Sequence, residues 1–339
     1  MQAYRAPRWL AGSGAVAGNV QTIWPALYSR VHPERRIGPV SYVRERWDTP
    51  DADFIDLDFL PAEVNVDAPP GASPRPLLVM FHGLEGSSQS HYARAFALWA
   101  HAQGWDFVVP HFRGCSGEIN RAPRAYHSGD HAELDWVLRR LRLRHPGPML
   151  AVGVSLGGNA LLRWAQEAGA QARSVVRAVV AVSSPIDLAA AGQAIARGFN
   201  RQVYTRMFLN SMKPKALAKL QQFPGLFDEA ALRRAADLHA YDNAFTAPLH
   251  GFASTEDYWA RCSAKPHLRA MREVPALVLN ARNDPFVPAD CLPGRSEVGP
   301  AVTLWQPAEG GHVGFPAGRF PGHVADLPQA VGRWLRQQL

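Results

Sequence analysis

The sequence contains little cysteine. Of its 339 residues only Cys115, Cys262 and Cys291 are cysteines, and no two of them form a Cys-x-x-Cys pair. Disulfide-stabilised domains and structural zinc sites need more cysteines at closer spacing, and such sparse usage fits a reducing compartment. We therefore predict a cytoplasmic protein without a disulfide framework or a cysteine-bound metal.

Long uninterrupted apolar runs are also absent. The first 25 residues contain no compact apolar region of the kind that a secretory signal requires. Residues 9–29 carry no charge, but Gly, Asn, Gln and Pro interrupt them, which disfavours a membrane-spanning helix. These absences predict a soluble chain and leave open a transient contact with a membrane surface.

The charge balance is positive, with 36 Lys and Arg against 29 Asp and Glu and a formal net charge of +7. One dense basic run, residues 139–145, spreads its arginines over several faces of an expected helix, near the helix C-terminus, where the dipole favours cations. We interpret it as a solvated helix end, with contact to nucleic acid or anionic lipid as the alternative. No nucleic-acid-binding motif accompanies it, so no nucleic-acid partner is expected.

Short apolar runs alternate with amphipathic stretches along most of the chain. Continuous apolar runs, typical of strands buried on both faces, occupy residues 77–83, 105–112, 149–155, 175–184, 275–281 and 301–306. Residues 53–60 alternate as a half-buried strand does, and helical patterns cover residues 90–103, 128–143, 158–168 and 324–338. This alternation predicts an α/β fold with a mostly parallel, doubly wound sheet.

The alternation breaks once, between Pro185 and Val274, where no strand is expected and stretches such as 214–223 and 228–241 have helical patterns. An insertion of this size between consecutive strands is best explained by helices that lie over one end of the sheet. We predict a core made of residues 1–184 and 275–339 and a helical cap insertion made of residues 185–274.

Ser155 lies between Gly153 and Gly157 in a Gly-x-Ser-x-Gly motif, which is a weak signal by itself. Here the motif directly follows an apolar run, MLAVGV, and opens a helical stretch, NALLRWAQEA. That strand–turn–helix setting is what a nucleophile elbow requires, because glycines beside the serine allow strand and helix to cross closely. We predict Ser155 as a nucleophile; the alternative is a glycine-rich turn without chemistry.

A serine hydroxyl needs a general base, and the base needs an acid that orients it. Asp284 lies three residues beyond an expected strand end at Ala281, and His312 lies six residues beyond another at Gln306. The chain order Ser155, Asp284, His312 is the order found in α/β-hydrolases. We therefore predict these three residues as a catalytic triad.

Other residues compete for these roles. Asp187 is an alternative acid, although its position suits the start of a cap helix. His323 is an alternative base at the start of the last helix, and Cys115 is an alternative nucleophile that lacks an elbow.

An oxyanion formed at the substrate carbonyl needs two backbone N–H donors. We expect them from Leu156, directly after the serine, and from Leu84, in the loop HGLEGSS. His82 and Gly83 of the same loop are expected beside the substrate.

The segment HFRGCSGE follows a predicted strand, and its residues Arg113, Gly114 and Cys115 are expected to line the pocket. Two interpretations of Arg113 are open: it orders the loop through contacts with backbone carbonyls, or it contacts an anionic group of a substrate.

His127 and His131 are spaced as two metal ligands on a helix would be, near Asp130 and Glu133. We prefer to interpret this stretch as a helix start in which Ser128 is the cap. No metal and no cofactor is predicted.

Seven longer motifs resemble one known family. They are GNVQTIWP, HGLEGSS, HFRGCSGEINRAPRAYHSGD, GVSLGGNALL, YDNAFTAPLHGF, LNARNDPFVP and GGHVGF, distributed over residues 18–315. Together they are similar to the YheT-like α/β-hydrolases, a bacterial branch related to the eukaryotic abhydrolase-domain lipid hydrolases. GNVQTIWP departs from that family's Asn-Pro-His-Leu-Gln-Thr run, which leaves the role of the N-terminal segment open.

The resemblance implies an α/β-hydrolase fold with a helical cap, a triad at Ser155, Asp284 and His312, and esterase activity. We therefore predict a serine hydrolase that cleaves short- to medium-chain acyl esters or lipid esters through an acyl-enzyme. A thioesterase or an acyltransferase would use the same triad, and a binding protein without catalysis would usually lack one of its members. Cap aromatics are expected in the core or in an acyl pocket: Phe208, Phe223, Phe227, Tyr258 and Trp259.

Overall fold

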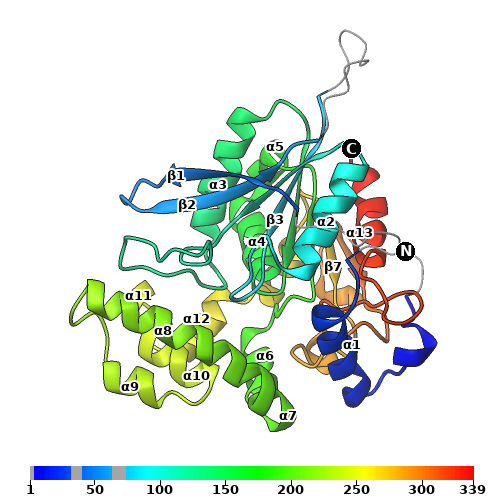
Figure 1. The fold of residues 1–339 in the computed structure, drawn as a ribbon. Helices are drawn as coiled ribbons and strands as arrows, with labels where there is room; N and C mark the ends of the chain where they lie inside the picture. Colours follow the sequence, from blue (N-terminus) through cyan, green and yellow to red (C-terminus); the bar gives the residue numbers. More distant parts are fainter. Residues whose placement is uncertain (1–3, 32–39, 63–73) are drawn as a thin grey trace.

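The computed structural model describes residues 4–31, 40–62 and 74–339. Its centre is an eight-stranded sheet with the order β1-β2-β4-β3-β5-β6-β7-β8 (Figure 1). The strands are β1 (Val43–Asp48), β2 (Phe54–Leu60), β3 (Leu77–Phe81), β4 (Asp106–Pro110), β5 (Met149–Val154), β6 (Val179–Val182), β7 (Ala276–Leu279) and β8 (Val302–Trp305). β1 and β2 pair antiparallel with their neighbours, and the other strands run parallel. The predicted mostly parallel, doubly wound sheet is confirmed.

The central strands β3, β5, β6 and β7 are buried along their whole length, which explains their continuous apolar sequences. Alternate residues enter different apolar clusters. Val79 packs toward α3 and α4, whereas Leu78 packs toward α2 and α13. Both faces of the sheet therefore need a covering layer of helices.

Helices supply these two layers (Figure 1). One face is covered by α3 (His131–Arg144), α4 (Leu156–Ala168) and α5 (Ala172–Val175), and the other by α2 (His91–Ala102) and α13 (Asp326–Arg336). The basic run at residues 139–145 ends α3, where Arg139 pairs with Asp135 and Arg144 pairs with Glu45. Within the described ranges, no helix is both long and apolar enough to cross a membrane.

Two elements were not predicted from the sequence. β1 has mostly exposed, charged residues and buries only Trp47, so its sequence lacks the pattern of a core strand. At the N-terminus, the 3-10 turn Arg8–Leu10 is followed by α1 (Ala15–Leu27), a helix that contains glycine and proline. Both residues disfavour helix from local propensity alone, so contacts elsewhere in the fold must stabilise α1.

The stretch between β6 and β7 is helical, and it lies beyond the end of the sheet at which β5 leads into α4 (Figure 1). It contains α6 (Leu188–Ile195), α7 (Gly198–Asn200), α8 (Arg206–Gln222), α9 (Glu229–Arg234), α10 (Leu238–Tyr241), α11 (Ala247–His250) and α12 (Thr255–Cys262). Two π-helical turns, Arg201–Thr205 and Asp242–Thr246, interrupt it. The remaining short helical turns of the fold are Gly169–Gln171, Lys265–Ala270, Ala289–Cys291 and Arg295–Glu297.

Candidate active site

Ser155 lies in a sharp turn between β5 and α4, with φ +52° and ψ −122°. Non-glycine residues rarely adopt this conformation, and such strain collects at functional sites. The flanking glycines permit the turn: a Cβ at Gly153 would lie 2.3 Å from the Gly157 carbonyl oxygen, and one at Gly157 would lie 2.4 Å from the His82 carbonyl oxygen. Strand, turn and helix therefore have the geometry of a nucleophile elbow.

The three residues of the predicted triad lie within hydrogen-bonding distance of one another. His312 Nε2 is 3.0 Å from Ser155 Oγ, and His312 Nδ1 is 2.9 Å from Asp284 Oδ2. Asp284 is buried, and its Oδ1 accepts hydrogen bonds from the N–H groups of Phe286 and Val287. With Nδ1–H donating to the carboxylate, Nε2 is left to accept a proton from the serine.

α1 contacts the loop that carries His312. Thr22 Oγ1 accepts a hydrogen bond of 2.8 Å from the His312 N–H, and Gln21 Oε1 accepts one of 2.8 Å from the Gly310 N–H. Both side chains are buried. They fix the backbone of the base loop at Gly310 and His312.

The same helix contacts the loop that carries the acid. Asn283 Nδ2 donates to Gln21 Oε1 at 2.8 Å, while Asn283 Oδ1 accepts from the Gly311 N–H at 3.0 Å. Gly18 allows this approach, because a Cβ there would lie 1.9 Å from the Asn283 carbonyl oxygen. The sequence held one hint of these contacts. The motif GNVQTIWP contains the polar residues Asn19, Gln21 and Thr22 within a mainly apolar stretch.

The two expected oxyanion donors lie in segments that meet beside Ser155. Leu156 is the first residue of α4, so no intrahelical carbonyl can accept from its N–H. Leu84 follows Gly83, where a Cβ would lie 3.1 Å from Ser155 Cβ, so this loop passes close to the serine. Leu84 and Leu156 both line the cavity described next.

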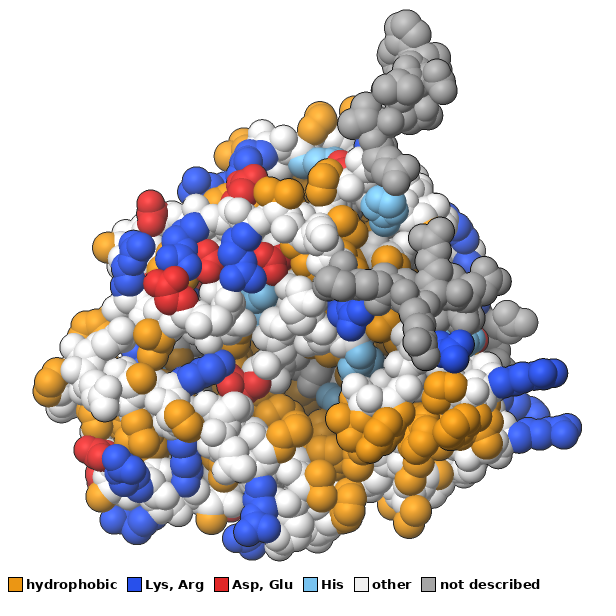
Figure 2. Space-filling view, in the orientation of Figure 1, with side chains coloured by type: hydrophobic (Ala, Val, Ile, Leu, Met, Phe, Trp, Pro, Cys, Tyr) orange, Lys and Arg blue, Asp and Glu red, His pale blue; other side chains and the backbone are white. Residues whose placement is uncertain are grey.

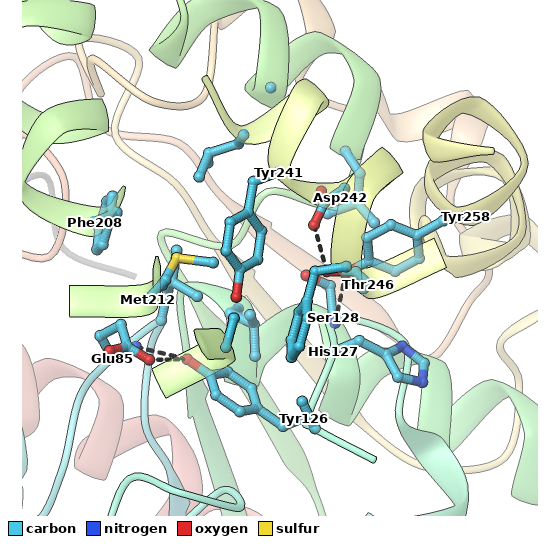
Figure 3. Close-up of a pocket in the computed structure, with 18 of the residues that line it drawn as sticks. Glu85, Tyr126, His127, Ser128, Phe208, Met212, Tyr241, Asp242, Thr246 and Tyr258 are labelled. Atoms are coloured by element: carbon cyan, nitrogen blue, oxygen red, sulfur yellow. Dashed lines mark hydrogen bonds between the residues drawn. The ribbon is translucent and has the colours of Figure 1, made fainter. Parts of the chain in front are cut away.

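A cavity of about 150 Å³ extends from Ser155 and His312 between the sheet and the helices of residues 185–274. Figure 3 shows Phe208, Met212 and Tyr241 directed into it from those helices, opposite Tyr126 and Glu85. Most of its lining is apolar: Leu84, Leu156, Leu188, Ala191, Ile195, Phe208, Met212, Leu238, Phe245, Trp259 and Phe286. Of the five cap aromatics considered from the sequence, Phe208, Tyr258 and Trp259 line the cavity.

Residues 76–318 match the family described as the alpha/beta hydrolase fold. The putative esterase YheT of Escherichia coli (strain K12) is 37% identical over 95% of this chain and 91% of its own. The chain belongs to the α/β-hydrolases, in their YheT-like branch. The resemblance inferred from the seven motifs is confirmed.

More distant α/β-hydrolases are also similar to it. Phospholipase ABHD3 of Mus musculus is 28% identical over 84% of this chain and 68% of its own, and monoacylglycerol lipase of Saccharomyces cerevisiae is 27% identical over 71% and 55%. Among solved structures, a Pyrococcus furiosus esterase has a TM-score of 0.52 at 16% identity, covering 91% of this chain and 98% of that one. Mouse alpha/beta hydrolase domain-containing protein 10 has a TM-score of 0.51 at 14% identity, covering 88% and 100%. At these identities the structures show the shared fold alone.

In this α/β-hydrolase His82 lies behind the cavity lining. Its Nε2 accepts from the Phe112 N–H at 3.1 Å, and its Nδ1 lies 2.8 Å from the Gly83 carbonyl oxygen. Burial lowers the pKa of His82 to about 3, so the ring is neutral. Gly83 is likewise outside the lining, and its N–H donates to the Tyr92 hydroxyl. We expect both residues beside the substrate, but neither belongs to the cavity lining. His82 joins the loops after β3 and β4, whereas Gly83 lies next to Ser155 and contacts Tyr92 of α2.

Arg113 reaches the cavity edge, but its guanidinium is engaged by carboxylates. Nη1 lies 2.7 Å from Asp51 Oδ2 and 2.8 Å from Asp53 Oδ2, and Nε lies 2.5 Å from Glu133 Oε2. Three of these four side chains are buried, Asp51 being the exception. The contacts favour the interpretation in which Arg113 orders the loop, but its partners are carboxylates and not the backbone carbonyls that we expected.

The residues after Arg113 differ in their access to the cavity. Gly114, with φ +73°, forms part of the lining. Cys115 is buried outside it, and desolvation raises the pKa of its thiol to about 12. Its sulfur is therefore protonated and a poor nucleophile at neutral pH.

The other candidates from the sequence lie elsewhere. Asp187 caps α6, accepting a hydrogen bond from the Ala190 N–H at 3.1 Å. His323 forms isolated bridges with Arg30 and Ala317, and the base contact to Ser155 is made by His312.

Three of the four side chains weighed as metal ligands, those of His127, Asp130 and Glu133, have other partners. His127 packs against His250 with ring centroids 4.5 Å apart, Asp130 pairs with Arg124, and Glu133 pairs with Arg113. In the part of the chain that the structure describes, no three His, Cys, Asp or Glu side chains are grouped to hold a metal ion.

Proposed function

We propose that this α/β-hydrolase hydrolyses carboxylic esters through a covalent intermediate on Ser155. The observation that carries the proposal is the chain of contacts from Ser155 Oγ through His312 to Asp284, built on a strained elbow at the mouth of an apolar cavity. This geometry supplies a nucleophile, a base within reach of its proton and an acid that orients the base.

The reaction proceeds in two halves. His312 Nε2 takes the Ser155 proton as Oγ attacks the ester carbonyl, and the N–H groups of Leu156 and Leu84 stabilise the oxyanion. His312 then gives the proton to the leaving alcohol. A water activated by the same imidazole attacks the acyl-serine, and the proton returns to Oγ as the acid is released.

The cavity favours esters with an apolar acyl chain. Its lining from residues 185–274 is mainly aliphatic and aromatic, and it begins at the nucleophile. The names of the relatives point the same way, since they include an esterase, a phospholipase and a monoacylglycerol lipase. We therefore propose short- to medium-chain acyl esters and lipid esters as the substrate class.

The proposal is tested first by covalent labelling. Purified protein treated with a fluorophosphonate probe should carry one adduct on the peptide that contains Ser155, and Ser155→Ala should carry none. Ser174→Ala, which changes an exposed serine, is the matched control and should label like the wild type. A labelled Ser155→Ala protein, or unlabelled wild type that is well folded, would refute the assignment.

Turnover then defines the substrate. A series of p-nitrophenyl esters of increasing acyl length, with the matching thioesters, should give hydrolysis that Ser155→Ala abolishes. If the protein prefers the thioester at equal acyl length, the proposed activity changes from esterase to thioesterase.

A further inference from the structure

Apolar side chains gather on the outer surface of α1 and the loop beside it. Figure 2 shows hydrophobic side chains concentrated over α1, at the lower right, with basic side chains at the margin. Val16 is 80% exposed, Leu27 66%, Tyr28 58% and Phe320 70%. Together with Val20, these residues are called the apolar face. Of ten exposed large hydrophobic side chains in the described ranges, the apolar face supplies five.

Aromatic rings form a rigid edge of the apolar face. Trp9, Trp24 and Phe320 contact one another with centroid distances of 5.5–5.6 Å. The Trp24 indole N–H donates to the Pro321 carbonyl oxygen at 2.8 Å, and the Trp9 indole N–H donates to that of Gly318 at 3.1 Å. An indole whose N–H group already has a hydrogen-bond acceptor can place the rest of its ring at the boundary between an apolar phase and water.

The active site fixes the direction in which α1 presents this face. Gln21 and Thr22, on the opposite side of the helix, hydrogen-bond to the base loop, and Gly18 packs on the acid loop. Turning α1 to bury its valines would break those contacts. The exposure therefore follows from the architecture of the site.

The chain segments that form and adjoin the apolar face are rich in arginine. Residues 4–31, 188–227 and 313–325 contain no Asp or Glu, although the whole chain has 29 of them. The exposed cations of these ranges are arginines: Arg5, Arg8, Arg30, Arg197, Arg201, Arg206 and Arg319. Lys215 is paired with Glu85 and Lys219 is buried, and the carboxylate of Glu309 contacts the N–H groups of Ala6 and Gly12 ahead of α1. A second copy of the chain would bring cations against cations, whereas an anionic lipid surface complements an apolar strip with a basic margin.

Packed side chains connect α1 to the lining of the cavity. Tyr204 donates from its hydroxyl to Asn19 Oδ1 at 2.8 Å, which joins α1 to the turn that precedes α8. Ile23 of α1 packs in one cluster with Phe208 and Phe286, and these two rings also line the cavity. Phe199 and Met207, on the same helical segment as Phe208, are exposed as well.

We propose that the apolar face is a docking surface for an anionic lipid bilayer, with α1 lying along the interface and the arginines around it contacting headgroups. Docking does not require catalysis. Only its consequence, the supply of lipid esters to the cavity from the membrane, rests on the proposed function.

The test is sedimentation with phosphatidylcholine vesicles prepared with and without phosphatidylglycerol, at low and high salt. The wild type should sediment with the anionic vesicles and be released by salt, because the basic margin is screened. For the triple variant Leu27→Glu, Tyr28→Ser, Phe320→Ser, the affinity for these vesicles should fall by at least about tenfold. Each change removes an apolar group that would insert into the bilayer. Leu143→Glu is the matched control: Leu143 is 89% exposed on α3, outside the apolar face, and its loss should leave binding unchanged.

Activity and mass distinguish the possible failures. All three proteins should hydrolyse a water-soluble short-chain ester equally, because none of the substituted residues touches the cavity. Wild type that is active but stays in the supernatant overturns the docking proposal alone, as does a triple variant that binds like the wild type. A wild-type dimer in light scattering that the triple variant loses would assign the face to a second copy instead. Vesicle binding without esterase activity would keep the docking surface and reject the proposed function.

Discussion

The hydroxyl oxygen of Thr22 accepts a hydrogen bond from the backbone N–H of His312, linking positions 290 residues apart at 2.8 Å. The contact joins the N-terminal helix to the base of the triad. Gln21, its neighbour, receives hydrogen bonds from both the base loop and the acid loop. α1 thus fixes two loops whose relative position sets the Asp284–His312 distance, and small errors in such positioning cost large factors in rate.

The first prediction concerns Thr22. Thr22→Val keeps the shape of the side chain but leaves a buried His312 N–H without its acceptor, at a cost of about 1–3 kcal/mol. We expect kcat on a soluble ester to fall about tenfold or more while KM changes little, because the substrate does not touch Thr22. Thr22→Ser, which restores the oxygen, should recover most of the rate. Equal kcat values for Thr22→Val and the wild type would show that the hydrogen bond between Thr22 and His312 does not position the base for catalysis.

A second prediction separates the acid of the triad from its rival. Asp284→Asn removes the charge that stabilises the imidazolium and disturbs the tautomer, so kcat should fall by about three to four orders of magnitude with the fold retained. Asp187→Asn, at the cap of α6, should keep nearly full kcat and lose only about 1 kcal/mol or less of unfolding free energy. The reverse ranking of the two variants in a steady-state assay would move the acid to Asp187.

The third prediction concerns the buried charges around Arg113. Arg113→Met leaves the carboxylates of Asp53 and Glu133 buried without their cation, which typically costs 3–5 kcal/mol. Thermal denaturation should show a clear drop in Tm, whereas Arg121→Gln, at an exposed pair with Asp48, should show almost none. If Arg113 instead bound an anionic substrate group, Arg113→Met would raise KM selectively for anionic esters and leave Tm near that of the wild type.

The sheet was predictable because its parallel strands are buried on both faces and therefore carry an apolar sequence whatever their neighbours are. The positions of Ser155, Asp284 and His312 followed from the same logic, since each comes after a strand that the pattern detects. β1 escaped prediction because an edge strand with one buried residue, Trp47, has no such pattern. Elements with a local sequence pattern could therefore be predicted, whereas elements that depend on contacts with distant residues could not.

α1 illustrates that limit. Its sequence contains Gly18 and Pro25, and its stability comes from contacts with residues nearly 300 positions away. His82 and Arg113 were recognised as belonging to loops near the serine. Their partners, the Phe112 N–H and three carboxylates, are set by the tertiary fold, so the sequence could not tell a side chain in the cavity from one that supports it.

A fourth prediction follows from three histidines that burial keeps neutral. Desolvation lowers the pKa of His82 and of His250 to about 3, and that of His91 to about 4. The unfolded chain protonates these rings below about pH 6.5 whereas the folded chain does not, so the unfolded state binds more protons there. Each of these histidines should therefore lower the stability as pH drops from 6.5 toward 4.5, by up to roughly 1.4 kcal/mol per pH unit. Burial raises the pKa of Glu133 to about 7 and that of Asp242 to about 6, and these two carboxyls act in the opposite direction.

Denaturant unfolding between pH 7 and 4.5 measures this slope. His250→Phe keeps an aromatic ring against His127 and removes one of these groups, so the loss of stability between pH 6.5 and 4.5 should be less steep than in the wild type, by up to roughly 1.4 kcal/mol per pH unit. An unchanged slope would mean that His250 is protonated in the folded state.

The last prediction asks which part of the substrate occupies the cavity. Met212 points into it from α8 (Figure 3), whereas Met207 on the same helix is 54% exposed. Met212→Trp should fill the space that an extended acyl chain needs, so kcat/KM should fall strongly for long-chain p-nitrophenyl esters and little for the acetate. Met207→Trp adds the same bulk outside and should leave the chain-length profile unchanged. If Met212→Trp instead discriminates between alcohols at constant acyl length, the cavity holds the leaving group, and the acyl chain must run along Ile195 and Phe286 toward α1.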